Sequence, residues 1–459
     1  MANYFKAKPK KTLPLSALNL TITRLDSHGQ GVAQLGSNKN TKPVFIPGAL
    51  PGEKVKVQIV EQKSKYAKAK LIEVLSSSKD RVQPLCEHFF NCGGCNLQHL
   101  SVSAQLSFKQ RQVTELFSRQ GVSENLPWQT PITAASWHYR RKARLGVQYN
   151  KQGQAVIGFR RQNSNQLQPI KHCTVLESVF DDLFDKLNKT VAKLSQSKSI
   201  GHIEVIYSHS GENEQQDHGD IVSLVIRQLK PINDVDKQCW QDFANQQSAA
   251  QTWQIFLDDG EKVSELTQCK TLQFTVDDDV TISFNSHDFI QVNDDINQKM
   301  VAQALQWLEL SNHDQVLDLF CGLGNFTLPI AKKVKHVVGI EGVDAMVQKA
   351  KTNALHNAIT NVDFYQADLN NDWLQQPCAN NVYTKAILDP ARAGALGAIK
   401  QLISLNINTI LYVSCDPNTL ASDSKILLLA GYRMIKISLL DMFTHTKHCE
   451  TMVLFQRKD

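Results

Sequence analysis

Three segments near the C-terminal end of the chain carry side chains that could act together on a substrate. Leu388–Arg392 (L-D-P-A-R) and Val413–Pro417 (V-S-C-D-P) each end a predicted strand, and Thr444–Glu450 (T-H-T-K-H-C-E) leads into the last one. Cys415 offers a thiol nucleophile, and Glu450 offers a carboxylate that can serve as a general base. A buried apolar cysteine is the alternative for Cys415, but its position at a strand end before Asp-Pro favours a reactive role.

The elements that must position these side chains alternate between strand and helix from about residue 290 onward. Apolar runs predict successive strands at Val316–Phe320, His336–Glu341, Val362–Asp368, Ala386–Asp389 and Thr409–Cys415. With helices between them, these strands predict a doubly wound parallel sheet that binds its ligand at the strand carboxyl ends. The final pair, Tyr432–Leu439 and Glu450–Arg457, is close in sequence and is expected to form an antiparallel edge.

The glycine turn after the first of these strands, Cys321–Asn325 (C-G-L-G-N), indicates a nucleotide-like cofactor. A dinucleotide-binding turn normally reads G-x-G-x-x-G, but Thr327 stands at the third glycine position. S-adenosylmethionine has no phosphate that needs a bare helix N-terminus, so it fits this turn better. Glu341 is then expected on the ribose and Asp368 at the adenine. These residues favour a methyltransferase over a dehydrogenase.

The two strand-end motifs distinguish between kinds of methyl transfer. Enzymes that methylate exocyclic amines need an aromatic residue after a D/N-P-P run, and Arg392 stands in that place. RNA cytosine-C5 enzymes generally carry a cysteine after the proline of the first motif, where this chain has Ala391. A single thiol on the following strand, Cys415, is the arrangement for attack on C6 of uracil. Asp389 is then expected to hydrogen-bond the uracil edge, and Arg392 to hold a phosphate or the developing oxyanion.

Three cysteines, Cys86, Cys92 and Cys95, lie closer together in C-E-H-F-F-N-C-G-G-C than a protein core requires. No apolar signal segment follows the basic N-terminus, so a reducing cytoplasm is expected, where thiols bind metal more often than they form disulfides. Cys173 in K-H-C is the best candidate for a fourth ligand. Four cysteines suit a [4Fe–4S] cluster or tetrahedral zinc, and the presence of only one C-x2-C pair favours iron–sulfur.

Positive charge is concentrated at the front of the chain. Residues 1–82 hold 15 Lys and Arg against 5 Asp and Glu, whereas the whole chain has a formal net charge of +6. Short alternating runs over residues 12–76 predict a small barrel of the oligonucleotide-binding type. Lysines interleaved with apolar residues on its last two strands favour phosphate contact over a merely solubilising tail. The stretches H-G-Q-G-V-A and V-F-I-P-G-A-L-P-G-E resemble a TRAM domain, an RNA-binding barrel of RNA-modifying enzymes.

A second basic segment, Trp137–Arg144 (W-H-Y-R-R-K-A-R), interleaves aromatic and cationic residues. Aromatic faces stack on exposed bases and cations hold phosphates. Tyr139, Arg140, Arg141 and Arg144 are therefore predicted to contact RNA. A solvated strand edge is the alternative interpretation.

Over nearly its whole length the chain resembles the RNA uracil-C5 methyltransferase family. Four motifs carry the likeness: D-L-F-C-G-L-G-N-F, L-D-P-A-R-A-G, V-S-C-D-P-N-T-L and H-x-x-H-x-E-T-M-V-L-F. The barrel and the C-x5-C-x2-C run narrow it to members that act on 23S ribosomal RNA. The resemblance implies that Cys415 adds to C6 of a uridine and Glu450 removes the C5 proton, giving 5-methyluridine. It also implies a [4Fe–4S] cluster on Cys86, Cys92, Cys95 and Cys173, and S-adenosylmethionine against Gln291, Phe320, Asn325, Glu341, Asp368 and Asp389.

Two positions depart from the family pattern. Many relatives have D-P-P-R where this chain has Ala391, and S-C-N-P where it has Asp416. Ala391 loses some turn rigidity, and Asp416 adds a negative charge beside the nucleophile that could raise its pKa. Neither change removes a group that the mechanism needs.

The expected organisation is multidomain. A TRAM barrel spans 1–77, a central α+β domain with the cluster and RNA-contacting loops spans 78–289, and a Rossmann-like methyltransferase domain spans 290–459. No apolar run is long enough to cross a bilayer, so no membrane association is expected. The protein is expected to be a monomer in the cytoplasm. The alternatives are a different or second ribosomal uridine, a transfer RNA substrate, an RNA-binding redox or sulfur-transfer protein, and a non-catalytic assembly factor.

Overall fold

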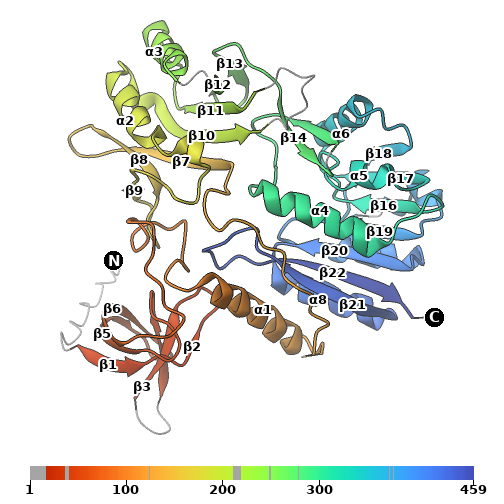
Figure 1. Cartoon of the computed structure of the whole chain (residues 1–459), viewed down its shortest axis with the longest axis horizontal. Helices are drawn as coiled ribbons and strands as arrows, with labels where there is room; N and C mark the ends of the chain where they lie inside the picture. The colour runs from red at the N-terminus through yellow and green to blue at the C-terminus, as the bar shows by residue number, and fades with distance from the viewer. Residues whose placement is uncertain are drawn as a thin grey trace, which may run out of the picture. The chain divides into compact units, whose positions relative to one another are not determined.

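The structure is a computed structural model that describes residues 17–36, 41–123, 125–209, 219–247, 250–277, 279–371, 373–375 and 377–458 (Figure 1). It divides into two compact units. The first comprises 1–90, 95–108 and 445–447, and the second comprises 91–94, 109–444 and 448–459. Within the described ranges, no helix is long and apolar enough to cross a membrane.

The first unit contains a six-stranded sheet in the order β1-β5-β6-β4-β3-β2. Its strands are β1 (Leu18–Thr21), β2 (Arg24–Leu25), β3 (Gly31–Leu35), β4 (Lys42–Ile46), β5 (Lys54–Gln62) and β6 (Ala67–Ser76). Alternate residues point inward, so Val44, Ile46, Val55 and Val57 are fully buried. The buried Glu53 carboxylate accepts hydrogen bonds from Arg81 Nε at 2.5 Å and from the Leu50 N–H at 2.8 Å. All six strands fall within residues 12–76, the region predicted to form the barrel.

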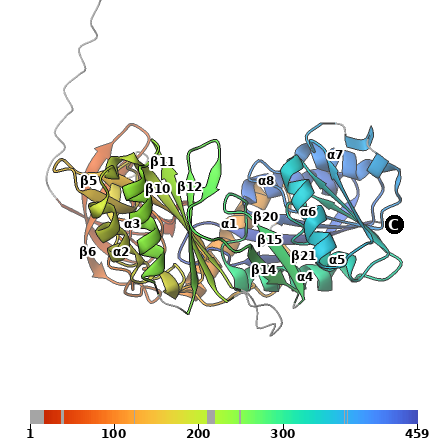
Figure 2. The ribbon, with the colours of Figure 1, turned by 90° about the horizontal axis from the view of Figure 1, so that it is seen from above.

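The middle of the second unit is a seven-stranded sheet in the order β13-β12-β11-β10-β7-β8-β9. The strands are β7 (Lys142–Tyr149), β8 (Ala155–Arg160), β9 (Leu167–Pro169), β10 (Ile200–Ser208), β11 (Ile221–Gln228), β12 (Thr252–Asp258) and β13 (Val263–Glu265). Helices α2 (Leu183–Lys193) and α3 (Asp234–Asn245) lie side by side against this sheet (Figure 2). Phe184, Leu187 and Trp240 bury the apolar faces of these helices. A separate hairpin, β14 (Leu272–Val276) and β15 (Val280–Phe284), follows the sheet.

The C-terminal part of the second unit is a sheet in the order β18-β17-β16-β19-β20-β22-β21. The strands are β16 (Gln315–Leu319), β17 (His336–Glu341), β18 (Val362–Gln366), β19 (Lys385–Leu388), β20 (Thr409–Ser414), β21 (Tyr432–Leu440) and β22 (Glu450–Arg457). The helices around it are α4 (Asp294–Leu308), α5 (Thr327–Ala331), α6 (Asp344–His356), α7 (Leu396–Ser404) and α8 (Pro417–Leu429). Earlier in the chain, α1 (Val102–Arg119) is the longest helix described.

The direction of the strands determines where a ligand can bind. Strands β16 to β20 pair in parallel, and β22 pairs with β20 in the antiparallel direction. Strand order reverses between β16 and β19, and in open α/β sheets ligands bind at the carboxyl ends of the strands at such a switch point. The predicted doubly wound sheet is confirmed. Strands β18 and β20 end earlier than predicted, and β19 is displaced by one residue toward the N-terminus, so that Asp368, Asp389 and Cys415 lie just beyond the strands that they were predicted to end.

Candidate active site

The glycine turn follows β16 at this switch point. Phe320 has a left-handed backbone with φ of 66°, and its N–H donates to the Ile340 carbonyl at 2.9 Å. Gly322 and Gly324 continue the turn with φ of 54° and 96°. A Cβ at Gly324 would lie 2.9 Å from Leu328 Cγ, so both the backbone angle and the close helix require glycine here. The turn leaves the carboxyl end of β16 open to a ligand.

Glu341 ends β17 beside this turn, with its carboxylate tied to the backbone. Its Oε2 accepts from the Gly322 N–H at 3.2 Å, and its Oε1 accepts from the Val343 N–H at 3.0 Å. An acid fixed in this way at the end of the second strand can accept hydrogen bonds from ribose hydroxyls. The geometry therefore supports the predicted role of Glu341.

Asn325 and Gln291 are linked to the first turns of α4. Asn325 and Asn297 exchange two side-chain hydrogen bonds, each 3.0 Å long. Asn293 caps α4 by accepting from the Ile296 N–H at 3.2 Å. Gln291 precedes this cap, and its carbonyl accepts from Arg141 Nε at 2.9 Å. Asn325 and Gln291 thus both lie next to the N-terminus of α4.

Asp368 and Asp389 lie beyond β18 and β19 at the same edge. Asp368 is exposed, and its carboxylate accepts from the Asn370 N–H at 3.0 Å and from Asn371 Nδ2 at 2.8 Å. Asp389 is partly buried, and burial raises its pKa to about 7. Both are therefore placed along the predicted cofactor edge.

Asp318, which the sequence analysis did not single out, is buried within β16. Thr327 Oγ1 donates to its Oδ2 at 2.5 Å, and its Oδ1 has no hydrogen-bond partner within the described structure. Burial, together with the charges of Asp389 and Glu341, raises the pKa of Asp318 to about 7, and the hydrogen bond from Thr327 opposes this shift. In the sequence, Asp318 is the one acid within an otherwise apolar strand, V-L-D-L-F, and this feature could have indicated a buried carboxyl group.

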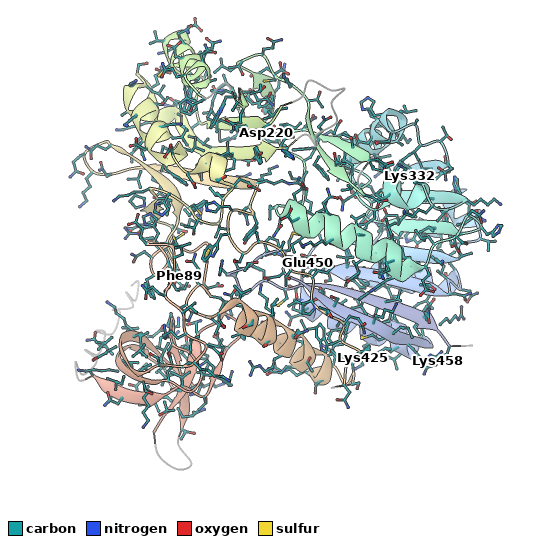
Figure 3. All side chains as sticks on the ribbon, in the orientation of Figure 1. Phe89, Asp220, Lys332, Lys425, Glu450 and Lys458 are labelled. Carbon is teal, nitrogen blue, oxygen red and sulfur yellow. The ribbon has the colours of Figure 1, made fainter. Side chains whose placement is uncertain are left out.

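Cys415 and Glu450 come from neighbouring antiparallel strands. Ser414 at the end of β20 pairs with Thr451 in β22, so the two reactive residues follow at the same end of this ladder. Glu450, which is labelled in Figure 3, is the first residue of β22, and it pairs with Leu440 of β21. Glu450 is buried, whereas Cys415 is partly accessible.

The charges around the thiol oppose one another. Burial, together with the charges of Glu450 and Asp389, raises the pKa of Cys415 to about 11, and the charge of Arg392 opposes this shift. Burial and the charge of Asp389 also hold the pKa of Glu450 well above its ordinary range, again opposed by Arg392. Arg392 itself is exposed. The charges of Asp389 and Arg392 therefore act on both the Cys415 thiol and the Glu450 carboxyl.

The two departures from the family pattern have local structural roles. Asp416 is the N-cap of α8, and its Oδ1 accepts from the Asn418 N–H at 2.9 Å. Ala391 closes a turn in which its carbonyl accepts from the Gly394 N–H at 2.9 Å. The Asp416 carboxylate is thus used as a helix cap directly after the nucleophile.

The basic segment predicted to contact RNA divides into buried and exposed parts. Arg141 is 3% exposed, and its Nη1 donates to Asp294 Oδ1 at 2.6 Å while its guanidinium stacks 4.6 Å from the Phe274 ring centre. Tyr139 is 5% exposed, and its hydroxyl donates to the Thr444 carbonyl at 3.0 Å. Both predicted RNA contacts need correction, because these side chains face the protein interior.

The other two arginines of this segment are more accessible. Arg140 is half-buried, and its Nε donates to the Lys142 carbonyl at 3.0 Å. Arg144 is exposed and pairs with Glu204 through an Nε–Oε1 bond of 2.8 Å. Arg144 is therefore the member of the predicted set that is best placed to meet an external phosphate.

The candidate metal ligands are four cysteines, Cys86, Cys92, Cys95 and Cys173. Among the described residues, no three His, Cys, Asp or Glu side chains are grouped so as to hold a metal ion. Burial raises the pKa of Cys173, while the Val175 and Leu176 N–H groups donate to its sulfur and oppose that shift. The Gly94 N–H donates to Cys92 Sγ at 3.4 Å. The predicted cluster on Cys86, Cys92, Cys95 and Cys173 remains a prediction.

The strand order, the glycine turn and the acid at the end of β17 define a Rossmann-like, S-adenosylmethionine-dependent methyltransferase. Residues 101–458 match the family model described as tRNA (Uracil-5-)-methyltransferase, and residues 13–72 match the TRAM domain. The chain belongs to the tRNA (uracil-5-)-methyltransferase family, whose reaction is methyl transfer to C5 of a uridine in RNA.

Two relatives with assigned names align with this chain over 99–100% of its length. A protein of Colwellia psychrerythraea is 48% identical over 99% of each chain, and one of Vibrio cholerae is 43% identical over 100% of each. Both are named 23S rRNA (uracil(1939)-C(5))-methyltransferase RlmD. The Pyrococcus abyssi tRNA (uracil-54, C5)-methyltransferase, solved with S-adenosyl-L-homocysteine, has a TM-score of 0.72 at 23% identity. The alignment covers 95% of this chain and 99% of that one, and it shows the shared fold.

Proposed function

We propose that this chain transfers the methyl group of S-adenosylmethionine to C5 of one uridine in 23S ribosomal RNA. The target would be the counterpart of uracil 1939 in the names of its relatives, and the product would be 5-methyluridine. The observation that carries the proposal is the pairing of Ser414 with Thr451, because it brings Cys415 and Glu450 to one end of the strand pair. A second observation is that Asp389 and Arg392 both influence the Cys415 thiol.

The chain's own residues divide the reaction into two steps. Cys415, once deprotonated, adds to C6 of the uracil and makes C5 electron-rich enough to take the methyl group. Glu450 then removes the C5 proton, the C6–S bond breaks, and the thiolate of Cys415 is released. Asp389 would hydrogen-bond the uracil edge, and Arg392 would stabilise the developing oxyanion. The target base must leave its stack to reach the thiol.

The residues along the strand ends fit S-adenosylmethionine. Its ribose would meet Glu341 and its adenine Asp368, while Gln291, Phe320, Asn325 and Asp389 would contact the remainder. When bound, it supplies an electrophilic methyl group on a positively charged sulfur. A positive charge here would lower the raised pKa values of Asp389 and Glu450, so that Glu450 is ionised when a base is needed.

For RNA binding we propose the exposed cations of both units. Exposed Lys54 of β5 and exposed Lys68 and Lys70 of β6 supply charge on the barrel, with half-buried Lys56 beside them, and Arg144 supplies it on the second unit. Such contacts carry affinity without sequence selection. We also propose that the enzyme acts as a cytoplasmic monomer, which sedimentation of the purified protein would test.

We propose, in addition, a [4Fe–4S] cluster on Cys86, Cys92, Cys95 and Cys173. The support is their spacing in the sequence and the N–H groups directed at the sulfurs of Cys92 and Cys173. The described structure does not group these side chains, and no step of the reaction is assigned to the cluster. Anaerobically purified protein should contain iron and labile sulfide, and Cys92→Ser should lose both. Zinc without sulfide would replace this proposal with the tetrahedral site.

The function is tested with labelled S-adenosylmethionine and unmodified ribosomal and transfer RNA in parallel. We expect label as 5-methyluridine at a single position of 23S RNA, and none with Cys415→Ala, which should still bind RNA. Label in transfer RNA alone or at two ribosomal sites would refute the proposed substrate. Absence of label despite cofactor binding would favour an assembly factor.

A further inference from the structure

A lysine is buried near the segment that leads to Glu450. Lys109 lies on α1, and its side chain is 1% exposed. Lysine is among the residues least often fully buried, and burial is tolerated when the ammonium group is paired. Its Nζ donates to Asp441 Oδ1 at 2.7 Å and to the Phe443 carbonyl at 3.1 Å. Two bonds thus run from one ammonium group to residues 441 and 443.

Other hydrogen bonds hold the same stretch of chain. Asp441 is 3% exposed, and its Oδ2 accepts from Thr444 Oγ1 at 2.8 Å. The Asp441 N–H donates to the Ile132 carbonyl at 2.9 Å. The Tyr139 hydroxyl donates to the Thr444 carbonyl at 3.0 Å. Residues 441–444 are therefore fixed from several directions by side chains distant in sequence.

This segment begins the connection between β21 and β22. Leu440, the last residue of β21, pairs with Glu450, so the connection leaves and returns at the same point of the ladder. Cys449, the residue before Glu450, is buried, and burial raises its pKa to about 11. Lys109 opposes that shift, while Asp441 and Glu450 add to it. The buried ion pair and the proposed base thus act on the same thiol.

We propose that Lys109 is a positioning residue for Glu450. Lys109 holds Asp441 and Phe443 at the start of the segment that connects β21 to β22. The conformation of this segment determines where Glu450, the first residue of β22, lies relative to Cys415. The inference rests on the proposed role of Glu450 as the base. Lys109 does not touch the substrate. Its effect should therefore appear in the step that needs Glu450, with little change in RNA affinity.

The covalent mechanism supplies a readout that a purely structural role would not change. If Glu450 is displaced, Cys415 still adds to C6 and the methyl group is still transferred, but the C5 proton leaves slowly. The methylated RNA then remains attached to Cys415 and survives denaturing electrophoresis. Simple loss of folded protein would lower adduct and product together.

The test compares Lys109→Met with Lys385→Met in the full-length chain. Lys385 is also largely buried and pairs with Asp314 at 2.9 Å, but it begins β19, at the opposite end of the strand from Asp389. We expect Lys109→Met to slow turnover on the order of 10–100-fold, as small displacements of catalytic groups do, with more adduct than wild type. Lys385→Met should lower stability without adding adduct. Tyr139→Phe, a milder change, should show a smaller effect in the same direction as Lys109→Met.

The Glu450→Gln variant distinguishes a failure of the positioning role of Lys109 from a failure of the proposed function. If Glu450→Gln accumulates adduct and neither Lys109→Met nor Tyr139→Phe does, the positioning inference is wrong and the proposed function stands. If wild type gives no 5-methyluridine, or Glu450→Gln gives no adduct, the proposed function itself fails. Should Lys109→Met not fold, Tyr139→Phe alone decides, because it removes only one hydroxyl.

Discussion

Thr451 of β22 lies opposite Ser414 of β20, one residue away from the proposed base and the proposed nucleophile respectively. The side-chain period of a strand is two, so a slip of one residue in this pairing would turn Glu450 to the other face of the sheet. The antiparallel direction of β22 also matters, because a parallel strand would present its last residue to this edge. The proposed reaction therefore requires this one register of β22 against β20, because it brings Glu450 and Cys415 to the same edge.

The charges around Cys415 predict opposite effects of two substitutions on its ionisation. Arg392→Ala removes the group that lowers the pKa of the thiol and should raise it further, whereas Asp389→Asn removes a charge that raises it and should lower it. The pH dependence of alkylation at the Cys415 peptide, followed by mass spectrometry, measures both. Shifts in the same direction would show that these groups do not act on the thiol through their charge.

The hydrogen bonds of Glu341 predict a selective loss of cofactor affinity. Glu341→Gln keeps the shape but exchanges one acceptor oxygen for a donor, which disturbs either the turn at Gly322 or the ribose contact. We expect the Kd for S-adenosylmethionine to rise about tenfold, equivalent to about 1.4 kcal/mol. RNA affinity should not change. Calorimetric titration of each ligand separates the two effects, and an equal loss of both would argue against a ribose contact.

The buried Asp318 predicts a pH-dependent stability. Its folded pKa of about 7 lies above the ordinary value of about 3.9, so between these pH values only the folded chain holds the proton. The contribution of Asp318 to the free energy of unfolding is therefore largest below about pH 4, and it decreases as the pH rises toward 7. Asp318→Asn removes this titration, and its melting temperature relative to wild type should increase from pH 5 to pH 8 without cofactor. A constant difference across that range would contradict the buried carboxyl.

Buried Arg141 and exposed Arg144 predict separable phenotypes. Arg141→Ala breaks the pair with Asp294 and should lower the melting temperature by several degrees, because a buried charge loses its partner. Arg144→Ala should change stability little but weaken RNA binding and reduce its salt dependence. Thermal melting and RNA binding at two salt concentrations test this assignment. An RNA defect in Arg141→Ala without loss of stability would restore the original prediction.

Much of the methyltransferase sheet could be predicted because its strands are apolar runs separated by glycine, proline and charged residues. His336–Glu341 and Glu450–Arg457 match the observed strands at both ends. The strand-end acids and the thiol were recognisable for the same reason, since parallel strands bring their carboxyl ends to one edge.

The remaining features depend on contacts between distant residues. Periodicity does not indicate that Tyr139 and Arg141 turn inward, because the partners that bury them, Thr444 and Asp294, are far away in the chain. Lys109 is an ordinary polar position on an amphipathic helix until Asp441 is seen beside it. The division into domains at residues 77 and 289 stays a prediction.

The central claim, that Cys415 attacks C6 of the target uridine, is tested most directly with RNA carrying 5-fluorouridine at the target position. Glu450 cannot remove fluorine as it removes a proton, so the methylated adduct cannot collapse. Wild type should form a complex that resists denaturation, requires S-adenosylmethionine, and yields an RNA-linked peptide containing Cys415. Attachment at another residue, or efficient methylation of normal RNA by Cys415→Ala, would contradict the claim.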